Sequence, residues 1–139
     1  MARDELYEAS LFEQLDKVMR LLDNYYEKID DVAYADLLSI ERALQISVEA
    51  FIGLSRYALQ QCHDIRVTRS REAIDELYEK KDFSKEEYDN ILKMIGFRNT
   101  LVHDYLKVNE AIVRAVIKNK LYQQLNQYAK KLRALISAP

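Results

Sequence analysis

The scarcity of glycine and proline is the feature that most limits what this chain can fold into. Glycine occurs only at Gly53 and Gly96, and proline only at Pro139. Tight β-hairpins and phosphate-cradling loops depend on glycine, so hairpin-rich folds and glycine-rich nucleotide loops are excluded. A length of 139 residues suits one domain, which we place over residues 1–139. We therefore expect a single all-α domain.

Apolar residues recur at three- and four-residue steps through most of the chain, which is typical of amphipathic helices. The expected helices cover residues 4–29, 34–62, 70–81 (a short one), about 85 into the segment near residue 100, and about 109 to near the C-terminus. Ser84 and Glu87 form a capping-box pattern at the fourth start, and Gly53 allows the first two helices to approach closely. Four long helices and one short helix then form an antiparallel bundle.

Charge, hydropathy and cysteine content narrow the functional class. The formal net charge is −2, which does not indicate a surface built for a polyanion. No run approaches the roughly 18 apolar residues of a membrane span, so we expect a cytoplasmic protein without a membrane partner. Cys62 is the only cysteine, and with two histidines the chain lacks a zinc ligand set. We therefore predict that Cys62 is a buried thiol and that His63 is structural.

A basic segment separates the second helix from the short third one. Arg66, Arg69 and Arg71 lie in a stretch, residues 64–71, that has no apolar period and should be a loop leading into the short helix. Such a charge run is usually a solvated surface. Contact with RNA is the less favoured alternative, and both interpretations stay open.

The segment from Arg98 to Tyr105 contains the residues best suited to form a catalytic site. If the helix continues through it, then Arg98, Asn99, His103 and Tyr105 fall within one arc of roughly 160°, and Asn99 and His103 are neighbours one turn apart. A cation, an amide, an imidazole and a phenol would then share one face beside apolar turns. A histidine that only hydrogen-bonds in the core is the structural alternative.

This segment resembles the signature of the HEPN superfamily, and the tyrosine after the histidine is similar to its HepT branch of toxins. The resemblance extends to residues 40–50, which look like the second helix of that branch, and to residues 94–106, which look like the helix leading into its site. Chain length, helix order and motif position also agree, so the resemblance covers nearly the whole chain.

The resemblance implies a metal-independent endoribonuclease without a cofactor, acting on single-stranded RNA and not on DNA. RNA supplies its own nucleophile, the 2′-hydroxyl, and His103 can accept or donate a proton near neutral pH. Arg98 can stabilise the charge that builds on the scissile phosphate, and Asn99 would orient His103 or the phosphate. One imidazole cannot easily serve both sides of one phosphorus, so a homodimer that brings two motifs to one cleft is expected.

The resemblance also implies a type VII-like toxin–antitoxin system, in which a minimal nucleotidyltransferase antitoxin attaches AMP to Tyr105. Occlusion by the antitoxin remains an alternative to modification, and whether tRNA or mRNA is cut stays open. A second hypothesis is a non-catalytic helical subunit that partners a nucleotidyltransferase. A purely structural bundle would leave the four polar residues on one arc unexplained.

Overall fold

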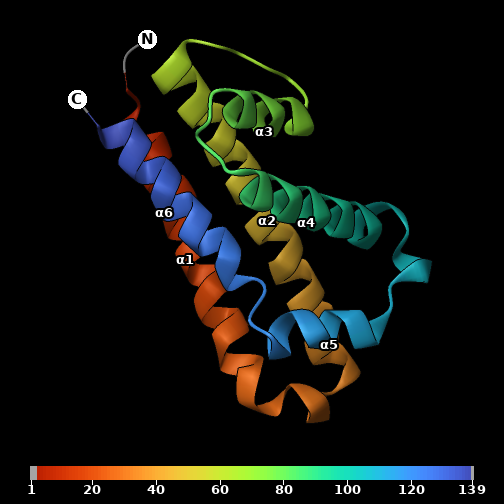
Figure 1. Ribbon diagram of the computed structural model, residues 1–139. Helices are drawn as coiled ribbons and strands as arrows, with labels where there is room; N and C mark the ends of the chain where they lie inside the picture. The colour runs from red at the N-terminus through yellow and green to blue at the C-terminus, as the bar shows by residue number, and fades with distance from the viewer. Residues whose placement is uncertain (1–2, 139) are drawn as a thin grey trace.

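All regular secondary structure in the described residues, 3–138, is helical, which confirms the expected all-α class. The computed structural model is shown in Figure 1. Its elements are α1 (Glu5–Tyr25), the 3₁₀ helix η1 (Tyr26–Asp31), α2 (Tyr34–His63), α3 (Ser70–Glu79), α4 (Lys85–His103), the 3₁₀ helix η2 (Tyr105–Lys107), α5 (Glu110–Lys118) and α6 (Gln123–Ser137). None of these helices is both long and apolar enough to cross a membrane.

The first two long helices pack antiparallel along most of their length, as expected (Figure 1). Asp4 caps α1, because its carboxylate accepts a hydrogen bond from the Tyr7 backbone nitrogen at 3.0 Å. Gly53 lies at the contact between the helices. A Cβ at this position would lie 3.3 Å from the Leu11 Cδ2 atom, so the glycine permits the close approach of α1 and α2.

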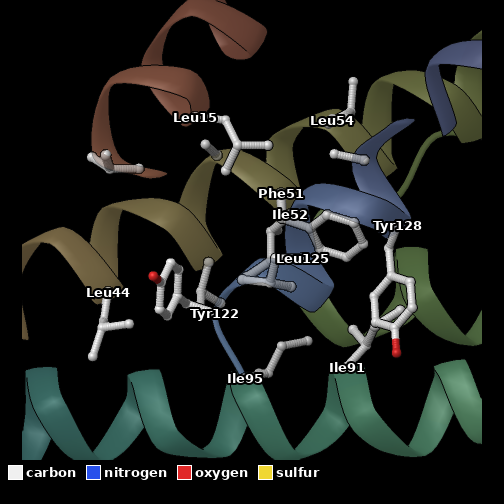
Figure 2. Close-up of a cluster of buried hydrophobic side chains, with 14 of the residues drawn as sticks. Leu15, Leu44, Phe51, Ile52, Leu54, Ile91, Ile95, Tyr122, Leu125 and Tyr128 are labelled. Atoms are coloured by element: carbon white, nitrogen blue, oxygen red, sulfur yellow. The ribbon is translucent and has the colours of Figure 1, made fainter. Parts of the chain in front are cut away.

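The core is centred on α2, with α4 and α6 packed against it. Figure 2 shows Ile91 and Ile95 of α4 pointing toward Phe51 of α2 and toward Leu125 and Tyr128 of α6. Phe51 and Ile91 are fully buried. Burying a side chain of this size stabilises the fold by roughly 1.5 to 3 kcal/mol. This packing fixes one face of α4, so the orientation of its last turns is fixed too.

The start of α4 follows the predicted capping box. The Ser84 hydroxyl accepts a hydrogen bond from the Glu87 backbone nitrogen at 3.2 Å, and the Glu87 carboxylate accepts one from the Ser84 backbone nitrogen at 2.7 Å. Lys131 of α6 forms an ion pair with Glu87 at 2.7 Å. The cap therefore sets the first residue of α4 and links it to α6.

The first helix is shorter than predicted. Regular α-helix ends at Tyr25 instead of near residue 29, and residues 26–31 form η1, where Lys28 leaves helical geometry with φ −112° and ψ 15°. The tighter turn buries Ile29 and presents its carbonyl oxygen to the Arg114 guanidinium of α5 at 2.5 Å. Contact with α5 therefore overrides the apolar pattern that predicted one continuous helix.

The prediction of one long C-terminal helix is wrong, and with it the expected number of helices. Asn109 caps α5 as expected, but α5 ends at Lys118 and a turn with Lys120 at φ 53° leads into α6. Tyr122, fully buried after this turn, donates its hydroxyl hydrogen to the Asp23 carboxylate of α1. The turn lets α5 pack on η1 while α6 packs along α1 and α2.

At the end of α2 the structure contradicts the prediction made for one side chain and agrees with the prediction made for the next. Cys62 is exposed, so the expectation of a buried thiol is wrong. It lies in the last turn of α2, just before Asp64 ends the helix with φ 54°. His63 has the structural role expected, because its Nε2 atom lies 2.6 Å from the Asp82 Oδ2 atom beyond α3. The pair ties the end of α2 to the segment between α3 and α4.

Candidate active site at the end of α4

The motif lies where α4 ends. Arg98, Asn99 and His103 belong to its last two turns, and Asp104 leaves helical geometry with φ −130° and ψ 42°. Tyr105 therefore begins η2 and does not continue the α-helical arc, which corrects the expectation of four residues on one helix face. The reason is a tertiary contact, since the chain turns here so that Val108 packs on the core and Asn109 caps α5.

The motif side chains are accessible, with one exception. Asn99 and His103 are exposed, and neither forms a hydrogen bond within residues 3–138. Tyr105 is 72% exposed and Leu106 is 88% exposed. Arg98 is half-buried, and its buried Nε atom has no hydrogen-bond partner among the described residues. An unpaired buried donor usually costs about 1 to 3 kcal/mol, so this atom of Arg98 does not stabilise the fold.

A hollow of about 360 Å³, lined by both polar and apolar side chains, opens beside Arg98. Its lining comes from two helices: Leu92, Ile95, Gly96, Arg98 and Asn99 from α4, and Ser70 and Arg71 from α3. From the sequence, the arginines of residues 64–71 were expected in a loop, and none of them was predicted as a site residue. Only tertiary structure brings Arg71 to the motif, because the start of α3 lies beside the last turns of α4.

Contacts with neighbouring side chains determine the electrostatics of Arg71. Its Nε atom lies 3.7 Å from the Asp75 carboxylate, in the same helix. Hydrogen bonding to the Tyr88 hydroxyl, followed by the negative charge of Asp75, raises the pKa of the Arg71 guanidinium above its ordinary value. Because an arginine guanidinium is always charged, Arg71 adds a second permanent cation to the hollow that Arg98 lines.

A second hollow, of about 320 Å³, lies between α4, α5 and α6 and is mainly apolar. Met94, Phe97 and Ile112 are among its lining residues, and none of the four motif residues is. The hollow beside Arg98 is therefore the one associated with the motif. In residues 3–138, no group of three or more His, Cys, Asp or Glu side chains is arranged to hold a metal ion.

Solved structures with this fold include toxins bound to antitoxins. A HEPN toxin of Shewanella oneidensis, tri-AMPylated and in complex with MNT antitoxin, is 22% identical with a TM-score of 0.81, covering 96% of this chain and 99% of that one. A toxin–antitoxin structure with AMP-PNP is 21% identical with a TM-score of 0.80, covering 94% and 99%. YutE, a Bacillus subtilis cytosolic protein of unknown function, is 17% identical with a TM-score of 0.64, covering 88% and 87%.

Sequence comparison identifies the family. No curated protein sequence matches this chain significantly. The family model described as Ribonuclease HepT-like matches residues 11–132, which includes every helix from α2 to α5 and the whole motif. The resemblance carried by residues 98–105 is thereby confirmed, and the chain belongs to the Ribonuclease HepT-like family of HEPN proteins.

Proposed function

We propose that this protein is a metal-independent endoribonuclease that acts as the toxin of a toxin–antitoxin pair. The observation that carries the proposal is the arrangement at the end of α4. Arg98, Asn99 and His103 lie there within two turns, beside the hollow, and their side chains have no hydrogen-bond partner among the described residues. Membership of the Ribonuclease HepT-like family supports the same reaction class.

The proposed reaction uses the 2′-hydroxyl of RNA as the nucleophile. His103 accepts the hydroxyl proton while the oxygen attacks the neighbouring phosphorus, and the bond to the 5′-oxygen breaks. That leaving oxygen takes a proton from a second imidazole. The Arg98 guanidinium donates hydrogen bonds to the phosphate oxygens as negative charge builds on them, and Asn99 contacts the same phosphate. The products carry a 2′,3′-cyclic phosphate and a 5′-hydroxyl.

A homodimer is proposed as the source of the second imidazole. Exposed apolar side chains support this, because Leu106 of η2 is 88% exposed and Ile112 of α5 is 52% exposed, and exposed apolar surface often marks an interface. A twofold partner covering them would place the partner's His103 near the first. Light scattering should then give twice the chain mass of 16.4 kDa, and a monomer at micromolar concentration would contradict the shared site.

Control by a minimal nucleotidyltransferase antitoxin completes the proposal. The Tyr105 hydroxyl would attack the α-phosphate of ATP, forming an O–P bond and releasing pyrophosphate and a proton. The high exposure of Tyr105 supports access by a second enzyme. Proteins with the same fold have been solved with MNT antitoxin, one of them AMPylated. The adduct would place a phosphate and a nucleoside at the mouth of the site, which excludes RNA.

The test is cleavage of single-stranded RNA by the purified protein in excess EDTA, followed by analysis of the ends. The expected products carry 2′,3′-cyclic phosphate and 5′-hydroxyl groups, and DNA of the same sequence should stay intact. Ends with 3′-hydroxyl and 5′-phosphate groups would show that water, and not the 2′-hydroxyl, is the nucleophile. Wild-type activity in His103→Ala would favour the non-catalytic subunit that partners a nucleotidyltransferase.

A further inference from the structure

The hollow beside Arg98 contains a second arginine that the proposed reaction does not use. Ser70 and Arg71, the first two residues of α3, share this hollow with Arg98 and Asn99 of α4. Figure 1 shows α3 and α4 side by side and antiparallel, which brings the start of α3 to the later turns of α4. Polar side chains from two different helices therefore converge on one hollow.

Neighbouring groups hold Arg71 in place without using all of its donors. Its Nε atom lies 3.7 Å from the Asp75 Oδ1 atom, and the Tyr88 hydroxyl donates a hydrogen bond to the same carboxylate oxygen at 2.5 Å. A guanidinium has five N–H donors, and the Arg71 side chain is 67% exposed. Arg71 is therefore positioned by both helices and can still donate hydrogen bonds into the hollow.

Ser70 is placed by an arginine of α2. The Nη2 atom of Arg56 donates hydrogen bonds to the Thr68 carbonyl oxygen at 2.8 Å and to the Ser70 Oγ atom at 3.4 Å. Because Ser70 accepts in this contact, its hydroxyl hydrogen remains able to donate to another group. Arg56 thus anchors the segment before α3 and fixes where Ser70 and Arg71 enter the hollow.

The hollow lies on the face of α4 that leads to His103. Leu92, Gly96, Asn99 and His103 follow one another at steps of three or four residues, so they share one face of the helix. Gly96 and His103 are separated by about 10 Å along the axis. Apart from the neighbouring backbone of α4 itself, no described atom lies within 4 Å of a Cβ built at Gly96, so this part of the hollow has room for a ligand group.

We propose that this hollow binds a second phosphate of the RNA chain, one that neighbours the phosphate being cleaved, with Arg71 and Ser70 as its donors. The proposal rests on the proposed function for the identity of the polymer. A planar guanidinium suits the paired oxygens of a phosphate, and a serine hydroxyl adds a third donor. Arg71 then acts in substrate binding and Arg98 in charge stabilisation at the reacting phosphorus.

Binding of an uncleavable strand tests the subsite directly. The probe is a short, fluorescently labelled 2′-O-methyl RNA, and anisotropy gives its affinity for the intact protein over a range of salt concentrations. Each phosphate contact on a single strand contributes about 0.7 to the slope of log affinity against log salt. We expect Arg71→Met and Gly96→Leu each to weaken binding of the strand. Arg71→Met should also lower the slope by about 0.7, and Arg71→Lys, which keeps the charge, should restore the wild-type slope.

Arg69→Met is the matched control. It removes the same charge two residues earlier, from a side chain that is 85% exposed and does not line the hollow, so binding should stay at the wild-type value. Circular dichroism of every variant checks that the helices are intact. The subsite is overturned if Arg71→Met matches wild type, if Arg69→Met has the same effect as Arg71→Met, or if the wild type does not bind the strand.

Substrate length gives a second, independent readout. A dinucleotide with a single phosphate cannot occupy the subsite, whereas a trinucleotide can. Arg71→Met should lower kcat/KM by a larger factor for the trinucleotide than for the dinucleotide and so remove the advantage of the longer substrate, and an equal loss on both substrates would contradict the subsite. If the wild type binds the strand in the Arg71-dependent way but cuts no RNA, the proposed nuclease fails while the phosphate site stands.

Discussion

Replacing Arg98 by methionine should make the protein more stable and inactive at the same time. The Arg98 Nε atom is buried without a hydrogen-bond partner among the described residues, and such a donor costs about 1 to 3 kcal/mol. Methionine keeps much of the aliphatic stem while removing the unpaired groups. Unfolding entropy is about 2.1 cal/mol/K per residue, so for 139 residues each 1 kcal/mol moves Tm by about 3 °C. We expect Arg98→Met to raise Tm by about 3 to 10 °C.

Thermal and urea unfolding of the two proteins at equal concentration measure this change, and an RNA cleavage assay measures the loss of activity. Arg71→Met is the control, because its side chain is 67% exposed and the substitution should change stability by no more than about 0.5 kcal/mol. A drop in Tm for Arg98→Met would refute the reasoning. It would mean that Arg98 stabilises the folded protein through a group outside the described chain, such as the homodimer partner, and is not kept free for a phosphate.

Three further predictions concern the motif and the N-terminal helix. His103→Ala should lower cleavage by about 10²- to 10⁴-fold while Tm stays unchanged, because His103 is exposed and unpaired in residues 3–138. Tyr105→Phe should fold normally but gain no AMP mass with nucleotidyltransferase and ATP, and equal labelling of both proteins would exclude Tyr105 as the acceptor. Hydrogen bonds from Arg3 lower the pKa of the buried Glu8 carboxyl, so this stabilisation is present above the ordinary Glu pKa of about 4.3 and is lost as pH falls through the lower, folded-state value. Glu8→Gln should therefore lower the urea midpoint of unfolding at pH 7. In the acid range, the midpoint of this variant should also change less with pH than the midpoint of the wild type.

Local sequence signals predicted the parts of the fold that local interactions determine. The range of α2 was predicted to within one residue, because its apolar stripe is long and faces the core on several sides. The start of α4 followed from Ser84 and Glu87, whose reciprocal hydrogen bonds form within one turn. The position of Arg98, Asn99 and His103 together on α4 followed from helical spacing alone.

The errors arose where tertiary contacts decide how a helix ends. Glycine is scarce in this chain, yet the non-glycine residues Asp64, Lys81 and Lys120 all adopt positive φ. Each lies near the end of a helix, and each carries a steric cost because its Cβ atom is crowded when φ is positive. At Lys120 the burial of Tyr122 and its hydrogen bond to Asp23 offset that cost. Apolar spacing does not report such contacts between distant parts of the chain.

The break in α4 after His103 separates the proposed catalytic and regulatory groups more clearly than a continuous helix would. Arg98 and His103 lie on a helix that Ile91 and Ile95 anchor in the core, so their spacing is fixed by packing. Tyr105 lies on η2, which packs on the end of α4. Had Tyr105 continued the helical arc beside Arg98, a modifying enzyme would have had to enter the cleft where RNA is proposed to bind. On η2 the exposed hydroxyl would be reachable from outside the proposed cleft, and the proposed modification there would block the site without disturbing the helix that holds the catalytic groups.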